Sequence, residues 1–278
     1  MLRNLKDLEN VKISATDGEI GHVKDLYFDD DAWAIRYFVV ETGTWLSSRK
    51  VLISPISVRH GNCLEQTLAV AITKEQVKNS PGIDTDKPVS RQNEEQYLGY
   101  YGYPNYWGGG GMWGDGLYPY EMVPGYAGMR VDHVEHERQE EENLQIERSL
   151  HRNDDPHLRS CQEVVGYHVH AEDGGVGHID GMLVDEATWA IRYVVVNTSN
   201  WWVGHKVLVS PEWITEVNWT DKSVSIDLTR NTLKESPPYD SAEDLNRRQE
   251  SGLYLHYGRV GYWDSRAVLQ PEIRLGHP

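Results

Sequence analysis

An eight-residue segment that occurs twice constrains this chain more than any other feature. Residues 33–40 read WAIRYFVV and residues 189–196 read WAIRYVVV, an offset of 189 − 33 = 156 positions. Apolar and polar residues alternate in this segment, and β-branched and aromatic residues dominate it, so it predicts a central β-strand. Between Ala15 and Pro55, 20 of the 41 pairs at this offset are identical. The chain is therefore expected to be a tandem duplication of a small β domain.

Short strands and tight turns are predicted in the same order in both repeats. Asp17-Gly18 is a strong hairpin signal because Gly tolerates positive φ, and a bulge is predicted near Gly21, where strict alternation stops. Further strands are expected at 50–53, continuing to 56–58 past Pro55, and at 64–71. Five or six short strands with close turns predict a small closed barrel, which leaves no unprotected edge. The repeated positions that define the pattern are Asp17, Gly18, Gly21, Trp33, Arg36, Asp173, Gly174, Gly177, Trp189 and Arg192.

These motifs together resemble those of a known family. A DG-x-x-G opening, the WAIRYxVV strand and the KVLxSP segment at 50–55 and 206–211 are similar to the PRC-barrel domain. This β-barrel occurs in the cytoplasmic part of the photosynthetic reaction-centre H subunit and in a ribosome-maturation factor. The resemblance covers a little over half of the chain. It implies a module for docking and assembly and implies no catalysis.

The chain is expected to divide into five segments. Residues 1–83 form the first barrel, 84–107 a helix and an aromatic strap, and 108–160 a flexible linker that is first Gly- and aromatic-rich and then charged. Residues 161–239 form the second barrel, and 240–278 a helix, a second strap and a tail.

Each strap either packs on a barrel or presents an aromatic patch to a protein partner, since Tyr and Trp are favoured interface anchors. A short polar helix that ends in Tyr-Trp follows each barrel, and residues 91–107 recur in part at 247–263. The candidate patch residues are Tyr101, Tyr106, Trp107, Tyr257, Tyr262 and Trp263.

Charge and cysteine content limit the classes of partner. Lys and Arg number 27 against 43 for Asp and Glu, a net charge of −16, so nucleic acid and anionic membranes are poor primary partners, and no nucleic-acid partner is predicted. Cys63 and Cys161 are not at matching positions, which favours two free thiols in a reducing compartment. Because no secretory signal and no membrane-length apolar segment is visible, we place the protein in the cytoplasm.

No motif for catalysis, cofactor binding or metal binding is identified. His22 and His178 occupy equivalent positions and would have to meet to hold a metal, and His133-x-x-His136 lies in the predicted linker. Arg36 and Arg192, inside the central strands, are expected to pair with the carboxylates of Asp29 and Asp185. No cofactor is predicted.

We therefore predict a non-enzymatic adaptor or assembly module for an unidentified protein partner. The first alternative, from the resemblance, is an accessory protein of photosynthetic electron transfer. The second is a metal-dependent enzyme that uses His22 and His178. The barrels are expected to form a pseudo-two-fold pair within a monomer, or to pair in a homodimer.

Overall fold

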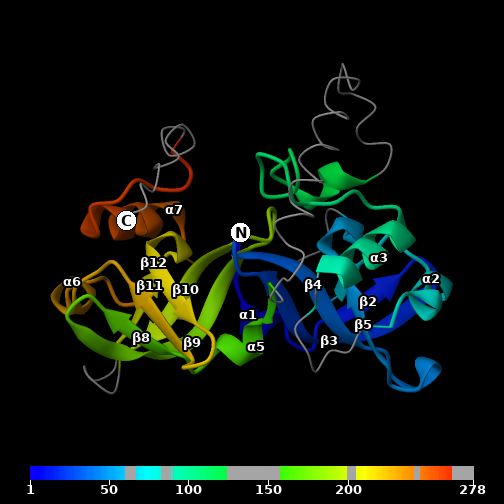
Figure 1. Ribbon diagram of the computed structural model, residues 1–278, viewed down its shortest axis with the longest axis horizontal. Coiled ribbons are helices and arrows are strands. Elements are labelled where there is room, and N and C mark those ends of the chain that lie inside the picture. The colour runs from blue at the N-terminus through cyan, green and yellow to red at the C-terminus, as the bar shows by residue number, and fades with distance from the viewer. Residues whose placement is uncertain are drawn as a thin grey trace. The chain divides into compact units, whose positions relative to one another are not determined.

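The structure, a computed structural model, describes residues 1–59, 67–82, 89, 91–123, 157–198, 205–240 and 245–264. It is mainly β and contains one sheet of seven strands and one of six (Figure 1). The predicted mainly β fold is confirmed, and each repeat, which was predicted to form a small barrel, supplies most strands of one sheet.

The first repeat builds the six-stranded sheet. Its strand order is β5-β4-β3-β2-β6. An antiparallel bridge between Val58 and Val70 joins the segment after β5 to the residue that follows β6, which links the two ends of this order. The strands are β2 (Lys12–Ala15), β3 (Gly18–Asp29), β4 (Ala34–Glu41), β5 (Lys50–Ile53) and β6 (Thr67–Ala69).

The second repeat forms the larger sheet in the same manner. Its order is β11-β10-β9-β8-β13-β12, and β8 pairs in parallel with β13 as β2 does with β6. The strands are β8 (His168–Ala171), β9 (Gly174–Asp185), β10 (Ile191–Asn197), β11 (Lys206–Val209), β12 (Ile214–Asn218) and β13 (Ser223–Ile226).

The prediction that the strand at 50–53 continues through 56–58 is wrong. Residues Pro55–Ser57 form a 3-10 helix, η2, because Pro55 occupies its first turn and the Ser54 hydroxyl accepts a hydrogen bond from the Ile56 N–H. The second repeat has the same helix, η5, at Pro211–Trp213.

The central strand begins one residue later than predicted in the first repeat, at Ala34, and two residues later in the second, at Ile191. Trp33 and Trp189 have φ values of 50° and 59°, in the left-handed region, and each donates its N–H to the carbonyl of the aspartate four residues before it. They therefore close the turns that precede β4 and β10. Residues 34–40 of β4 are all buried, so both faces of this strand are covered.

The predicted bulge is present, and it explains Gly21. The register between β2 and β3 shifts between Ile13 and Ser14, opposite residues 19–21 of β3. A Cβ at Gly21 would overlap the carbonyl oxygen of Glu41. Gly177 has the same relation to Asn197 in the second repeat. Both positions therefore require glycine, because the backbones of two strands meet there without room for a side chain.

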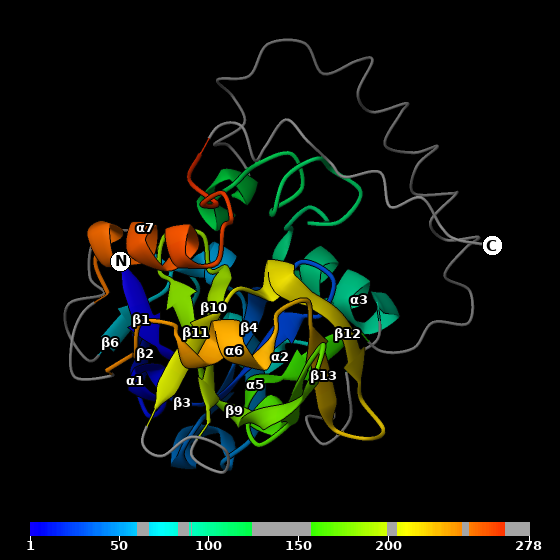
Figure 2. The same cartoon turned by 90° about the vertical axis from the view of Figure 1, so that its left-hand side faces the viewer.

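Short helices complete each repeat. α2 (Lys74–Asn79) starts at a capping box, in which Thr73 and Gln76 satisfy each other's backbone N–H. Tyr97 of α3 donates its hydroxyl to the Leu52 carbonyl of β5, so α3 packs on the sheet of the first repeat. α7 lies beside β11, and residues of both elements, such as Leu208 and Leu253, line the same hollow (Figure 2). The remaining bounds are α1 (Leu5–Leu8), α3 (Arg91–Tyr101), α5 (Cys161–Val164), α6 (Arg230–Lys234), α7 (Arg247–His256), η1 (Thr44–Leu46) and η3 (Pro119–Met122).

Residue contacts divide the chain into two compact units. Unit 1 consists of Met1–Gly166 and Gly181–Val194, and unit 2 of Tyr167–Asp180 and Val195–Pro278. The end of β9 and the start of β10 thus belong to unit 1, although they come from the second repeat. Two parts of the segment 108–160, for which a flexible linker was expected, have a defined structure: residues 108–123, which include η3, and 157–160.

Within unit 1 the two repeats exchange their first strands. β1 (Leu2–Asn4) pairs antiparallel with residues 183–185 of β9, and β7 (Leu158–Ser160) pairs with residues 27–29 of β3. The strands β3 and β9 are 12 residues long and outrun their neighbours β2 and β8, so the exchanged strands cover edges that would otherwise be unpaired.

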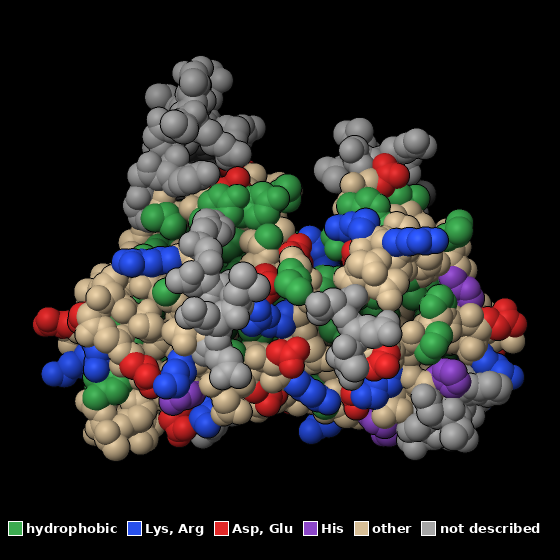
Figure 3. Space-filling model, turned by 180° about the vertical axis from the view of Figure 1, so that it is seen from behind, with side chains coloured by type: hydrophobic (Ala, Val, Ile, Leu, Met, Phe, Trp, Pro, Cys, Tyr) green, Lys and Arg blue, Asp and Glu red, His purple; other side chains and the backbone are tan. Residues whose placement is uncertain are grey.

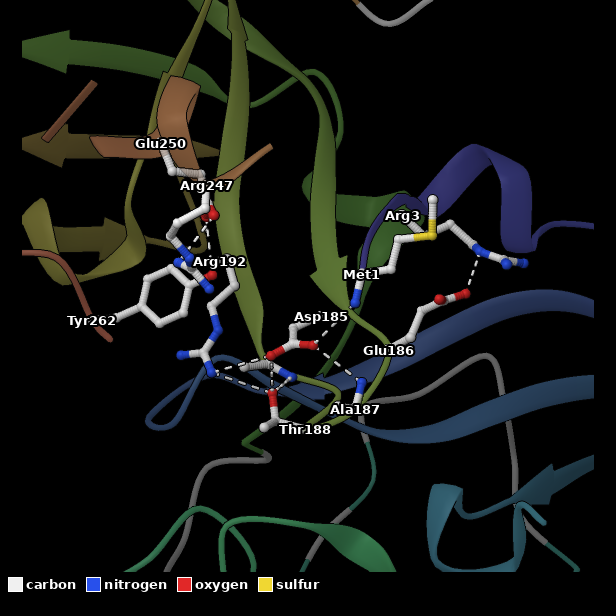
Figure 4. A network of polar contacts seen from close by, with 11 residues as sticks. Met1, Arg3, Asp185, Glu186, Ala187, Thr188, Arg192, Arg247, Glu250 and Tyr262 are labelled. Carbon is white, nitrogen blue, oxygen red and sulfur yellow. Dashed lines mark hydrogen bonds and ion pairs between the residues drawn. The ribbon is translucent and has the colours of Figure 1, made fainter. Parts of the chain in front are cut away.

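Polar contacts at the exchange follow the same reciprocal pattern. The Arg3 Nε lies 2.5 Å from Glu186 Oε1, and the Arg159 Nε lies 3.0 Å from Asp30 Oδ2 (Figure 4 shows the first pair). The offset of 156 relates the two pairs residue by residue. At the centre of the exchange, Ala34 bridges to Ala190.

Candidate functional site

Six side chains of unit 1 form a buried polar and aromatic group beneath the first strap. They come from β3, β4, α3, the strap, the turn after it and the residue before β7. We call them the Arg36 cluster: Asp29, Arg36, Glu94, Tyr106, Trp113 and His157.

Arg36 is the centre of this cluster. Its Nη2 lies 3.4 Å from Asp29 Oδ2, and its Nη1 donates to the Met112 carbonyl at 2.7 Å. The predicted pair between Arg36 and Asp29 is therefore present, with only 2% and 5% of the side chains exposed. The guanidinium carbon also lies 3.9 Å from the ring centre of Tyr106 and 4.6 Å from that of Trp113. Arg36 is thus enclosed by aromatic faces, which favour a cation there.

The charge of Asp29 is maintained by its neighbours. Burial by itself would raise the pKa of this carboxyl, but the Arg36 guanidinium and the hydrogen bond from the Ala32 N–H outweigh it and hold the pKa below its usual range. Oδ1 accepts from the N–H groups of Asp31 and Ala32 at 3.0 and 3.2 Å. The turn before β4 is therefore closed by a carboxylate that stays ionised.

Glu94 is the second buried carboxylate of the cluster. It is 1% exposed, accepts a short hydrogen bond from the Tyr106 hydroxyl, and has His157 Nε2 2.7 Å from Oε2. Burial, and then the charge of Glu94, raise the pKa of Tyr106 well above its usual value. The phenol is therefore neutral and acts as the donor. This bond fastens the strap to α3.

Trp113 connects the cluster to the second repeat. It is fully buried, and its Nε1 donates to the Thr188 carbonyl at 2.8 Å within unit 1. The turn that carries it is closed by hydrogen bonds from Gly111 N to Gly114 O and from Trp113 N to Gly116 O. Sequence reasoning missed this residue because the Gly-rich segment has no periodicity. A tryptophan between turn-forming glycines was the available signal.

The second strap, in unit 2, repeats three contacts of the first. Glu250 accepts from the Tyr262 hydroxyl at 2.9 Å and lies 3.0 Å from Arg247 Nη1 (Figure 4). The Arg247 guanidinium stacks 4.2 Å from the ring centre of Trp263, as Arg91 does 4.3 Å from that of Trp107. Burial and the charge of Glu250 raise the pKa of Tyr262 to about 12, so it too is a donor at neutral pH.

The two equivalent arginines differ in burial. Arg192 Nη2 lies 3.4 Å from Asp185 Oδ2, which confirms the second predicted pair, but 18% and 17% of these side chains are exposed. Asp185 also accepts from Thr188 Oγ1 at 2.9 Å (Figure 4). The second pair is therefore more hydrated than the pair of Arg36 and Asp29.

Most of the predicted patch residues are at least partly buried. Tyr106 and Tyr257 are buried, and Tyr101, Trp107 and Tyr262 are half-buried. Trp263 is 37% exposed. Packing of the straps on their own repeats therefore accounts for most of these side chains, and the second strap retains the exposed remainder.

Two further apolar side chains, one in α7 and one in the second strap, are also exposed. Leu255, in the last turn of α7, is 82% exposed, and Val260 is 57% exposed. A hydrogen bond from Gly258 N to Leu255 O and another from Arg259 N to Tyr254 O fold the chain between them into a tight turn. We call Leu255, Val260 and Trp263 the second-strap rim.

His22 belongs to unit 1 and His178 to unit 2, so the hypothesis that they meet stays a prediction. Cys161 is a buried free thiol whose pKa is raised by burial, and Cys63 lies outside the described residues, as do His133 and His136.

Among the described residues, one acidic group brings three possible metal ligand atoms within 4.8 Å of one another: Asp29, Asp30 and Asp31. Asp29 and Asp30 are already paired with Arg36 and Arg159. This group therefore serves the turn and the strand exchange.

None of the described helices has the length and apolar character that crossing a membrane requires.

Comparison with known proteins identifies the first repeat. Residues 3–76 match the family model of the PRC-barrel domain. An uncharacterized protein of Deinococcus radiodurans is 33% identical over 90 residues, which cover 28% of this chain and 32% of that protein. The match therefore spans about a third of this curated relative, whose name states no activity.

Proposed function

We propose that this chain, whose residues 3–76 form a PRC-barrel domain, is a non-enzymatic adaptor that holds a protein partner in an assembly. The resemblance of the domain to modules that dock and assemble supports this role. We also propose a cytoplasmic location.

The second-strap rim is the observation that carries the proposal. Leu255, Val260 and Trp263 expose apolar surface on a segment that Glu250 and Arg247 fix to α7. An apolar group presented on a rigid base loses little conformational entropy on binding, which favours an interface.

The first strap differs at the corresponding positions, and this difference gives the rim a specific role. Gly99 and Pro104 occupy the positions of Leu255 and Val260. If the exposed leucine only covered the barrel, it would be buried, but it has the largest exposed fraction of the chain's exposed large apolar side chains within the described residues. We therefore place partner binding at the second strap.

The Arg36 cluster supports a structural role for the polar residues of unit 1. Asp29, Arg36 and Glu94 are 4%, 2% and 1% exposed, so a substrate has no access to them without unfolding of the strap. Their hydrogen bonds and ion pairs join the strap, the turn after it and the central strand.

The experiment is affinity capture with the full chain from a lysate of the source organism. We expect the wild type to recover a defined protein, and the double variant Leu255→Ser, Val260→Ser to lose it. Leu117→Ser is the matched control, because Leu117 is 60% exposed in unit 1. Recovery of the same protein by the double variant, or loss with the control, would contradict the proposal.

A further inference from the structure

We propose that His168, His170 and His178 of the second repeat bind one divalent transition-metal ion of the zinc class on the outer face of the sheet. This site is independent of the proposed adaptor role. All three residues belong to unit 2, two on β8 and one on β9.

The strand register places two of these histidines directly opposite each other. His168 and His178 are partners in the antiparallel pairing of β8 and β9. The Ile179 N–H donates to the Tyr167 carbonyl at 2.9 Å, so the neighbouring pair of Tyr167 and Ile179 is a hydrogen-bonded pair. His168 and His178 then form a non-hydrogen-bonded pair, in which Cβ atoms lie closest, about 4.5–5.5 Å apart.

The third histidine lies on the same face. Along β8, His168 and His170 are exposed, whereas Val169 and Ala171 are buried. Residues two apart on a strand lie about 6.6 Å apart, within reach of a shared ion. The bulge places Gly175 opposite His170, so no side chain opposes it.

His178 also points outward, because it is half-buried and its neighbour Ile179 is fully buried. Figure 3 shows one face of the molecule, on which several histidine side chains reach the surface among charges of both signs. The three imidazoles therefore share the solvent face of one hairpin.

The ring nitrogens of these histidines are available as ligands. Within the described part of the chain, none of the three imidazoles makes a hydrogen bond or an ion pair. Imidazole suits zinc, copper and nickel, and three protein ligands leave a position for water or for a donor from a partner.

Binding requires the rings to turn. The acidic group Asp29–Asp31 is the described set in which three ligand atoms already lie within 4.8 Å, so the imidazoles do not yet converge. Exposed side chains change rotamer within nanoseconds, and the register of β8 and β9 fixes where the three side chains start. Metal binding is therefore expected to reorient side chains without moving the strands.

The first repeat lacks the site, which supplies an internal control. Lys12, Ser14 and His22 occupy the positions of His168, His170 and His178. Lys12 is the strand partner of His22 and lies 3.4 Å from Glu19 Oε2. An ammonium group beside a single imidazole disfavours a second cation.

The test is calorimetric titration of the metal-free full chain with Zn²⁺. All chains carry His133→Ala and His136→Ala to remove the other candidate ligands. We expect one site in this background, and a loss of affinity of at least about tenfold in His168→Ala and in His178→Ala, since removal of even an outer-shell partner costs 10–100-fold. His22→Ala is the matched control and should bind as the background does.

A second measurement keeps the test independent of stability. On addition of Zn²⁺, the imidazole proton signals of the three histidines should shift together in an NMR spectrum, and that of His22 should not. Unchanged affinity in His168→Ala and His178→Ala, or an equal loss in His22→Ala, would overturn the proposal.

Discussion

Replacement of Arg36 by methionine tests whether the Arg36 cluster holds unit 1 together. Met retains much of the apolar stem but removes the guanidinium, which leaves the Asp29 carboxylate and the Met112 carbonyl without their partner. Removing one member of a buried pair costs about 3–5 kcal/mol, because the other charge remains buried. We expect Arg36→Met to lower the free energy of unfolding of unit 1 by about this amount.

The assay is urea denaturation of the full chain, followed by fluorescence of its 10 tryptophans. Arg192→Met is the matched control. Its pair with Asp185 is 18% and 17% exposed, so water replaces part of the interaction, and we expect a loss of about 1 kcal/mol. The double variant Asp29→Asn, Arg36→Met should recover part of the stability that Arg36→Met loses, because it no longer buries an unpaired carboxylate at position 29.

The pH dependence supplies a second criterion. In the wild type the pKa of Asp29 is lower in the folded than in the unfolded state. The ion pair with Arg36 therefore contributes its full stability to the fold above the unfolded-state pKa of Asp29. This contribution is lost as the pH falls through the folded-state pKa of Asp29. Without Arg36, we expect the pKa of Asp29 to be higher than in the wild type, because the largest influence that opposes burial is removed. The deficit of Arg36→Met should therefore be largest at neutral pH and shrink with acidification.

Two results would refute the reasoning. One is an equal cost for Arg36→Met and Arg192→Met, which would mean that burial of the pair has no effect. The other is a double variant with Asp29→Asn that is as unstable as Arg36→Met alone, because the loss would then not come from the unpaired carboxylate.

Two further substitutions test the close approach of strands and the role of the turn. Gly21→Ala should destabilise unit 1 strongly, because the added Cβ overlaps the Glu41 carbonyl. Its control, Gly99→Ala, lies in open space on α3 and should be neutral or stabilising by up to about 1 kcal/mol. Thermal denaturation compares the two variants, and similar melting temperatures would contradict the overlap at Gly21. Trp113→Phe removes the hydrogen bond to the Thr188 carbonyl and should cost about 1–3 kcal/mol in urea denaturation, and an unchanged midpoint would show that this bond does not stabilise unit 1.

Local patterns predicted the elements that depend on neighbours in the chain. The alternation in 33–40 and the turn residues Asp17-Gly18 each act over a few positions, and both the strand and the hairpin are present. The pairing of Arg36 with Asp29 was also predictable, since a charged residue in a buried strand needs an opposite charge.

The candidate sites were predicted only in part. The straps were identified through their repetition, but their exposure was not, because exposure depends on what packs against each side chain. Leu255 gave no signal by itself, since a leucine at the end of a polar helix is compatible with burial or exposure. His168 and His170 became relevant only when the register placed them beside His178.

The sequence by itself determined that one β unit is present twice, because the two copies can be aligned residue by residue. It also determined where most strands, turns and required glycines lie, because these depend on the propensities of residues that are close in the chain. Only the tertiary structure decided that β1 and β7 pair with the opposite repeat, and that Trp113 and His157 join Arg36 and Glu94. Three-residue strands and lone side chains carry no periodicity. Their partners are selected by the unpaired edges and buried charges that exist only once the two sheets have formed.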